Sequence, residues 1–84
     1  MFEYDEAKSK ANKEKHGIDF EEAQALWKNK KNFVFDSIYI NSEWRHLLVG
    51  LINDICYVVV FTMREDNIRI ISVRRCRKNE KELL

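Results

Sequence analysis

Residues 61–77 read FTMREDNIRIISVRRCR. Apolar and polar residues mostly alternate in two runs, which are separated by a short polar segment. This pattern predicts a β-hairpin whose polar turn joins two strands. If Met63 pairs with Ile68, Thr62 lies opposite Arg69, and a slip of one residue would change every such partner. We therefore expect residues 61–77 to form the last hairpin of an antiparallel sheet.

Arginines recur along this hairpin although the whole chain carries a net charge of only +1. Between Arg69 and Lys81 there are six basic residues against the single acidic Glu80. An arginine held on a strand presents a planar set of donors that suits phosphate. Singly, each arginine is better explained as a surface residue in an ion pair. Their clustering on one sheet favours anion binding, and Arg64 and Arg69 should lie at the end opposite to Arg74.

The apolar side chains recur with a period of two from Phe33 onward, which predicts strands joined by tight turns. The predicted strands cover residues 33–40, 43–52, 55–63 and 68–75. Asn53 and Asp54 form a two-residue hairpin turn of the kind that tolerates positive φ. The third strand is apolar on both faces, which predicts a central strand that is covered on both sides or paired to a partner chain.

Two helices are predicted ahead of the sheet. Asp5 is a good N-cap for residues 6–15, and Gly17 stands where a left-handed helix stop is wanted. Asp19 and Glu22 form an aspartate version of the capping box for the second helix. Its apolar face is made by Phe20, Ala23, Leu26 and Trp27.

The resulting fold class is α+β, with two N-terminal helices packed on a four-stranded antiparallel sheet. We expect a single domain over residues 1–84, with a tail from Lys78 that is either a short helix or frayed. No apolar run approaches roughly 20 residues, and residues 1–8 lack the pattern of a secretory signal, so we expect neither a membrane span nor a secretory signal. Two cysteines are too few for a disulfide framework, which favours a reduced, cytoplasmic protein. Cys56 and Cys76 could lie nearly opposite each other across the last hairpin, so that a disulfide is sterically conceivable, but such a compartment argues against one.

His16 and His46 are the side chains that titrate near neutral pH without special tuning. His16 could act as general base or acid in phosphodiester cleavage, although a helix-terminating histidine is the simpler interpretation. His46 belongs either to the edge of the core or to the sheet surface. The histidines and cysteines are zinc-ligand types without the short spacings of a zinc site. We therefore expect no metal and no other cofactor.

Short motifs in a fixed order run along nearly the whole chain. They are Phe2-Glu3-Tyr4-Asp5 with Lys8 and Asn12, Lys15-His16-Gly17-Ile18, Phe20-Glu21-Glu22-Ala23, Arg45 ahead of Gly50, Thr62-x-Arg64, and Arg69-Ile70-Ile71-Ser72-x-Arg74-Arg75. No single motif is specific, but the ordered set resembles the BrnT family of small toxins, within the RelE-like ribonuclease class. Val73 and Cys76 stand where that family usually has alanine, and the C-terminal tail looks short.

The resemblance implies a RelE-like fold and a toxin that cleaves RNA without a metal, inhibiting translation and growth. It also implies neutralisation by a BrnA-like antitoxin of the ribbon-helix-helix type, in a hetero-oligomer. In that family the complex represses its own operon, with the antitoxin supplying the contact to operator DNA. No membrane partner is implied. The alternative from another class is a non-catalytic co-repressor module, whose basic sheet edge grips nucleic acid or an acidic protein.

A reaction consistent with these residues starts with attack of the RNA 2′-hydroxyl on its adjacent phosphorus. Arginines would stabilise the charge that gathers on the non-bridging oxygens. The expected catalytic residues are Arg64, Arg69, Arg74 and His16. Substrate-binding roles are expected for Arg45, Thr62, Ser72, Arg75 and Lys15.

Overall fold

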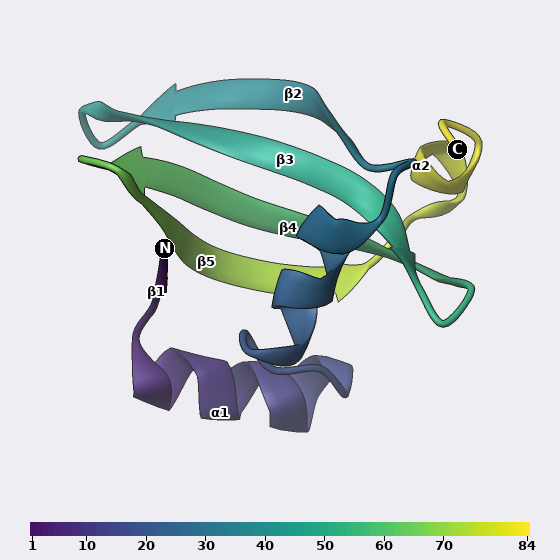
Figure 1. Ribbon diagram of the computed structural model, residues 1–84, viewed down its shortest axis with the longest axis horizontal. Helices are drawn as coiled ribbons and strands as arrows, with labels where there is room; N and C mark the ends of the chain where they lie inside the picture. Colours follow the sequence, from purple (N-terminus) through teal and green to yellow (C-terminus); the bar gives the residue numbers. More distant parts are fainter.

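A curved five-stranded sheet forms most of the computed structural model, which describes residues 1–84 (Figure 1). Its four long strands are β2 (Phe33–Ile40), β3 (Glu43–Ile52), β4 (Ile55–Arg64) and β5 (Asn67–Arg75). They form an antiparallel meander, as expected. The short strand β1 (Phe2–Glu3) pairs in parallel with β5, so that the strand order is β1-β5-β4-β3-β2.

The expected fold class was wrong in its sheet and in its second helix. The sheet is mixed and five-stranded, because β1 adds a parallel edge in the register Phe2↔Ile68 and Glu3↔Arg69. A two-residue strand has no alternation that a sequence pattern could reveal. Of the two N-terminal helices, only α1 (Glu6–His16) is an α-helix, since η1 (Glu22–Lys28) is a 3₁₀ helix.

The spacing of buried side chains explains why η1 is a 3₁₀ helix. Phe20, Ala23 and Leu26 are almost completely buried and lie three residues apart. A 3₁₀ helix has three residues per turn, so side chains at this spacing line up on one face, whereas in an α-helix they would drift around the axis. The predicted capping box forms ahead of η1: Asp19 N donates to Glu22 Oε1 over 3.0 Å, and Glu22 N donates to Asp19 Oδ1 over 2.7 Å.

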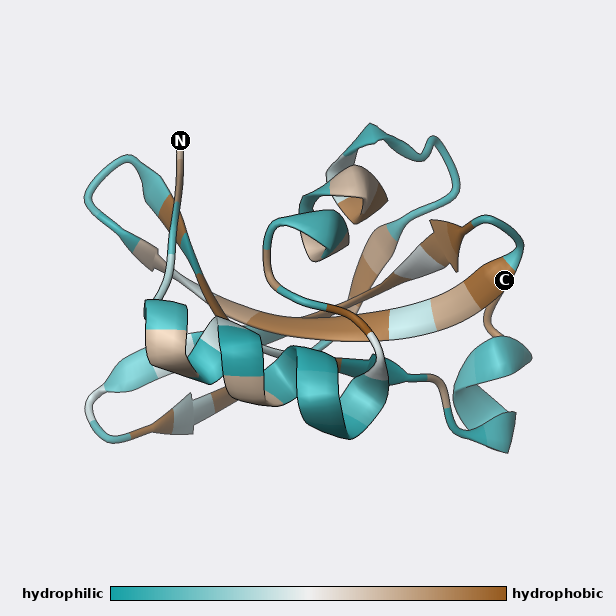
Figure 2. Cartoon of the chain, turned by 90° about the horizontal axis from the view of Figure 1, so that it is seen from below, coloured by the Kyte–Doolittle hydropathy of each residue, from teal (hydrophilic) through white to brown (hydrophobic).

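Helix α1 has the predicted ends but buries no apolar side chain. Asp5 Oδ1 accepts from Lys8 N over 3.0 Å, and Gly17 stops the helix with a φ of 77°. The buried residues of α1 are Ser9 and Asn12. Figure 2 shows this largely hydrophilic helix lying along the sheet. It is attached by hydrogen bonds rather than by an apolar stripe.

Asn12 makes most of that attachment. Its Nδ2 donates to Ile18 O and to Val73 O, each over 2.8 Å, and its Oδ1 accepts from Val73 N over 3.4 Å. Ser9 Oγ accepts from Phe20 N over 2.9 Å. These bonds connect α1 both to the segment that leads into η1 and to β5.

The core lies on both faces of the sheet. On one face η1 packs over a cluster that includes Leu48, Val59, Phe61 and Ile70. On the other face a smaller cluster is formed by Val49, Val58, Cys56 and Cys76, with Phe35, Leu47 and Leu51 packed against it. Of the two alternatives for the strand at residues 55–63, cover on both sides or pairing to a partner chain, the structure shows the first. No helix is long and apolar enough to cross a membrane.

Of the two registers that the sequence left open for the last hairpin, the structure has the first. Met63 pairs with Ile68 and Thr62 with Arg69, and a bulge follows between Val60 and Phe61. Because Val60 pairs with Ser72 and Phe61 with Ile70, Ile71 is the extra residue on β5. The bulge lies beside α1, where it lets β5 bend. At the turn between β3 and β4, Asn53 and Asp54 have the expected positive φ, 51° and 65°.

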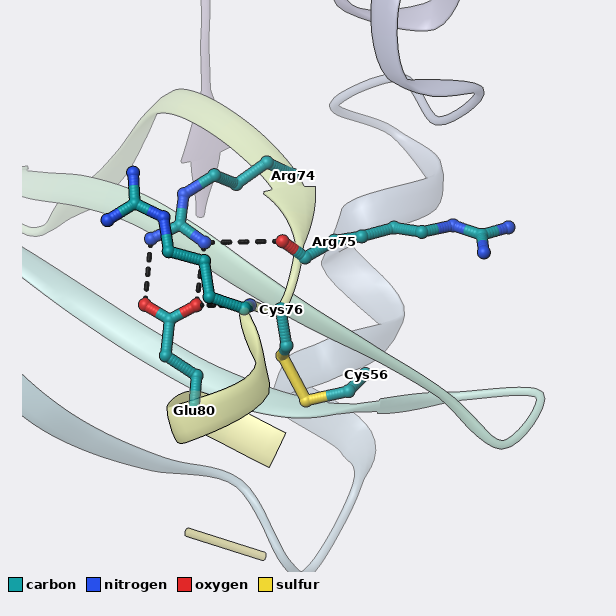
Figure 3. Close-up of a disulfide and its surroundings, with 6 residues drawn as sticks. Cys56, Arg74, Arg75, Cys76 and Glu80 are labelled. Atoms are coloured by element: carbon teal, nitrogen blue, oxygen red, sulfur yellow. Dashed lines mark hydrogen bonds and ion pairs between the residues drawn. A yellow bond between two sulfur atoms is a disulfide. The ribbon is translucent and has the colours of Figure 1, made fainter. Parts of the chain in front are cut away.

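Cys56 and Cys76 form a disulfide, contrary to the expectation of reduced thiols (Figure 3). The two Cα atoms are 5.3 Å apart, and Cys76 N donates to Cys56 O over 3.0 Å. Tyr57 pairs with Arg75 at the end of the β4–β5 ladder, so the next residues along, Cys56 and Cys76, lie opposite each other. The sheet register thus places the two cysteines where they can bond. It fixes the point at which the C-terminal tail leaves the sheet.

Beyond the disulfide, the tail forms the short helix α2 (Lys78–Lys81), which is attached to β5 by a paired charge. Arg74 donates to Glu80 through two bonds of 2.7 and 2.8 Å, and Arg77 N donates to the same carboxylate over 2.7 Å (Figure 3). The Glu80 side chain is only 6% exposed. The pKa of Glu80 is lowered to about 2, and the largest cause is the hydrogen bonding from Arg74.

Replacing both cysteines by alanine should lower the free energy of unfolding by about 3 kcal/mol, because the disulfide restricts the unfolded chain. Its two cysteines are 20 residues apart. Urea denaturation of both proteins measures the difference. Dithiothreitol should destabilise the original chain and leave the double variant unchanged. Equal stability of the two proteins under oxidising conditions would contradict the role of the bond.

Glu80→Gln should remove a pH-dependent part of the stability. Because the pKa of Glu80 falls on folding from its ordinary 4.5 to about 2, its stabilisation is complete above pH 4.5 and is lost as the pH falls toward 2. The full contribution is about 3 kcal/mol. Thermal unfolding measured across this range should show a smaller acid loss for Glu80→Gln. The exposed Glu82→Gln serves as the matched control, and an identical pH profile for both variants would refute the assignment.

Candidate functional site

Three arginines from three strands meet at the end of the sheet where β4 turns into β5. Arg45 comes from β3, Arg64 from the end of β4 and Arg69 from β5, and Lys8 joins them from the first half of α1. They line a cavity of about 100 Å³, which we call the arginine pocket. Its other lining residues are Asp5, Glu43, Ile70 and Ile71.

The hairpin register and β1 together position the arginines. Thr62 and Arg69 are cross-strand partners, and Arg64 follows Thr62 on the same face because strand residues alternate. Glu3 of β1 is the partner of Arg69 in the sheet, and the Glu3 carboxylate accepts from Arg69 over 3.0 Å. The short parallel strand therefore holds one pocket arginine in place.

Glu43 holds the other two arginines. Its carboxylate lies 3.4 Å from Arg45 Nε and 3.8 Å from Arg64, which is itself about half exposed. Such partly exposed pairs contribute little to stability, but they fix where the guanidinium groups point. Glu43 and Arg45 are two residues apart on β3, so that their side chains lie on the same face of the sheet. The approach of the same carboxylate to Arg64, which is remote in sequence, has no local signal.

Lys15, His16 and Ser72 lie in a second cavity, between α1 and β5, of about 270 Å³. We call it the helix pocket. Lys8 and Ile71 line both this cavity and the arginine pocket, so the two adjoin. Ile71 takes this place because it is the extra residue of the bulge. The two adjoining pockets lie along α1 with positive side chains at both ends, and we refer to the two together as the channel.

Arg74 and Arg75 lie away from this channel, which agrees with the expected split of the arginines between two ends of the hairpin. Arg74 is held by Glu80, which raises the pKa of Arg74 by hydrogen bonding. Arg75 is exposed and extends away from that pair (Figure 3). It lines a separate cavity beside the disulfide. The structure does not bring either arginine to Arg64 and Arg69.

Thr62 also has a different environment from the expected one. Its side chain is buried, and its Oγ1 donates to Trp44 O over 2.7 Å. That bond joins β4 to the start of β3 and leaves the hydroxyl proton engaged. Three site residues, Lys8, Glu3 and Glu43, were missing from the expected set. Lys8 and Glu3 depend on the placement of the N-terminal segment against β5, which no local pattern reveals.

The chain matches the family model described as ribonuclease toxin, BrnT, of type II toxin-antitoxin system, over residues 4–80. The matched region includes all residues of the arginine pocket and of the helix pocket. A search among curated proteins finds no match. Because the family model covers most of the chain, from before α1 into α2, the resemblance seen in the motifs is confirmed. The chain belongs to the BrnT family of ribonuclease toxins of type II toxin–antitoxin systems.

Proposed function

We propose that this protein is an endoribonuclease toxin that binds the scissile phosphate of RNA in the arginine pocket and needs no metal for cleavage. Family membership supports the ribonuclease activity. The observation that carries the site assignment is the convergence of Arg45, Arg64 and Arg69 with Lys8 on one cavity. Guanidinium groups can form paired hydrogen bonds to phosphate oxygens, which suits them to this role.

In the proposed reaction the RNA 2′-oxygen forms a bond to the adjacent phosphorus as its proton passes to a base. The bond from phosphorus to the 5′-oxygen breaks, and that oxygen takes a proton from solvent water as it leaves. The products are a 2′,3′-cyclic phosphate and a 5′-hydroxyl. Negative charge grows on the non-bridging oxygens during attack, and Arg45, Arg64 and Arg69 stabilise it. Lys8 adds a further positive charge on the α1 side of the pocket.

Glu43 is the proposed base because of its position. Its carboxylate lies in the arginine pocket, next to two of the arginines that would hold the phosphate. His16, the proton-transfer candidate chosen because histidine titrates near neutral pH, lies eight residues beyond Lys8 on α1. That separation corresponds to about 12 Å along the helix axis. We therefore assign His16 with Lys15 and Ser72 to an adjoining nucleotide, which the helix pocket would hold.

Arg74 and Arg75 receive different assignments. The bidentate pair with Glu80 gives Arg74 a role in attaching the tail, so its substitution should act through stability. Arg75 is exposed and free of such a pair, and we assign it to contact with a more distant part of the RNA backbone.

A type II toxin implies an antitoxin partner. We propose that this partner is a BrnA-like antitoxin of the ribbon-helix-helix type, and that the complex represses its own operon through the antitoxin. The edge strand β2 supports protein binding. One of its two edges is unpaired, and Val34, Ile38 and Ile40 are each nearly half exposed. An exposed apolar edge is a site at which another chain can add a strand.

RNA cleavage in the presence of EDTA tests the proposal. Arg64→Ala and Arg69→Ala should each lower the cleavage rate about 100-fold or more, as is typical when a group that stabilises a developing oxyanion is lost. Lys30→Ala, which removes an exposed charge outside the channel, should leave the rate unchanged. Gel analysis of end-labelled RNA gives the rates, and circular dichroism confirms that each variant is folded.

Cleavage that requires added divalent metal would contradict the proposal, as would cleavage that persists after all three pocket arginines are replaced. RNA binding that weakens with salt but yields no cleavage products would favour the co-repressor module instead.

A further inference from the structure

An aromatic pair lies exposed at the tip of the β2–β3 hairpin. Tyr39 and Trp44 are cross-strand partners, and their ring centroids are 5.3 Å apart at an interplanar angle of 65°. Both side chains nevertheless remain more than half exposed, at 59% and 55%. Large aromatic side chains usually contribute to a core or an interface. This pair contributes to neither core cluster, so its rings are available to a ligand.

A cavity of about 380 Å³ lies beside Trp44, lined also by Glu43, His46, Thr62 and Met63. The His46 ring is held there by two contacts. Its centroid is 5.3 Å from that of Phe61, and its Nδ1 is 2.8 Å from Ser37 Oγ. That leaves Nε2 as the ring nitrogen through which His46 can hydrogen-bond an incoming group. The cavity thus combines an aromatic face, an apolar side chain and a polar edge.

This cavity lies beside the arginine pocket, across the end of the sheet. Glu43 lines both cavities. Trp44 and Arg45 are consecutive on β3, as Met63 and Arg64 are on β4. Consecutive strand residues extend to opposite faces, so each strand gives one side chain to each cavity. A single strand of RNA that passes around the ends of β3 and β4 can therefore contact both.

We propose that Trp44, supported by Tyr39, stacks on an unpaired base of the RNA whose phosphate lies in the arginine pocket. The inference rests on the proposed function and adds a subsite for the base. Unpaired bases in RNA are commonly recognised by stacking on exposed aromatic side chains and by hydrogen bonds to their edges. The adjoining arginines favour nucleic acid over an apolar protein segment, because their positive charge complements a phosphate backbone.

Trp44 fluorescence provides a direct test. The chain has two tryptophans, so Trp27→Phe leaves Trp44 as the only one. The ligand is a single-stranded oligodeoxynucleotide, which lacks the 2′-hydroxyl nucleophile and is not cleaved. The control ligand is an abasic oligonucleotide of the same length. We expect the ligand with bases to quench Trp44 and to bind roughly 5- to 100-fold more tightly than the abasic one, the range given by loss of one stacked base.

The matched variants are Trp44→Ala and Phe33→Ala, each of which removes an exposed aromatic ring from the β2–β3 pair of strands. Binding to these variants is followed by the fluorescence anisotropy of a dye-labelled ligand, because Trp44→Ala lacks the reporter ring. Trp44→Ala should lower the affinity for the ligand with bases to that for the abasic one and leave the affinity for the abasic ligand unchanged. Phe33→Ala should alter neither affinity. Thermal unfolding confirms that the variants are folded.

Equal affinities for the two ligands in the original chain would overturn the inference, as would unchanged binding of the ligand with bases by Trp44→Ala. Loss of antitoxin binding in Trp44→Ala, with oligonucleotide binding intact, would assign the ring to the protein partner instead. Arg64→Ala separates the two proposals, because it should lower the affinity for both ligands. If it does so while Trp44→Ala has no effect, the base subsite fails and the phosphate site stands.

Discussion

The hydrogen bonds of Asn12 are the contact on which the proposed site depends most. Helix α1 buries no apolar side chain, so packing alone does not hold it against β5. One buried amide instead satisfies two carbonyls, Ile18 O and Val73 O, and accepts from Val73 N. An apolar replacement would leave these buried backbone groups without partners. Lys8, Lys15 and His16 line the channel from α1. The loss of Asn12 would therefore displace the side chains on this side of the channel.

The hairpin of β4 and β5 sorts the arginines into two groups with different tasks. Its register brings Arg64 and Arg69 to the turn, where Glu43 and Glu3 orient Arg64 and Arg69, respectively. At the other end Arg74 is committed to Glu80, and the disulfide lies next to that pair. The same arginine-rich motif thus provides the proposed phosphate site at one end and an anchor for the tail at the other.

Much of the fold was predictable where neighbours in sequence decide the structure. The hairpin turn at Asn53 and Asp54 and the caps of α1 depend on local pattern, and they formed as expected. The last hairpin took one of the two registers that its pattern allowed. The parallel strand β1, the Cys56–Cys76 bond and the pairing of Arg74 with Glu80 depend on tertiary placement. The same distinction between local pattern and tertiary placement applies to the candidate site. A cluster of arginines could be predicted, but the choice of members required the tail and the N-terminal strand.

The most direct test of the account is an NMR titration that follows the arginine side-chain Nε–Hε signals as a non-cleavable single-stranded oligonucleotide is added. If the arginine pocket holds the phosphate, the signals of Arg45, Arg64 and Arg69 should shift together and saturably. The signal of Arg74 should remain in place, because its guanidinium stays with Glu80. A titration in which Arg74 shifts and the three pocket arginines do not would contradict the account.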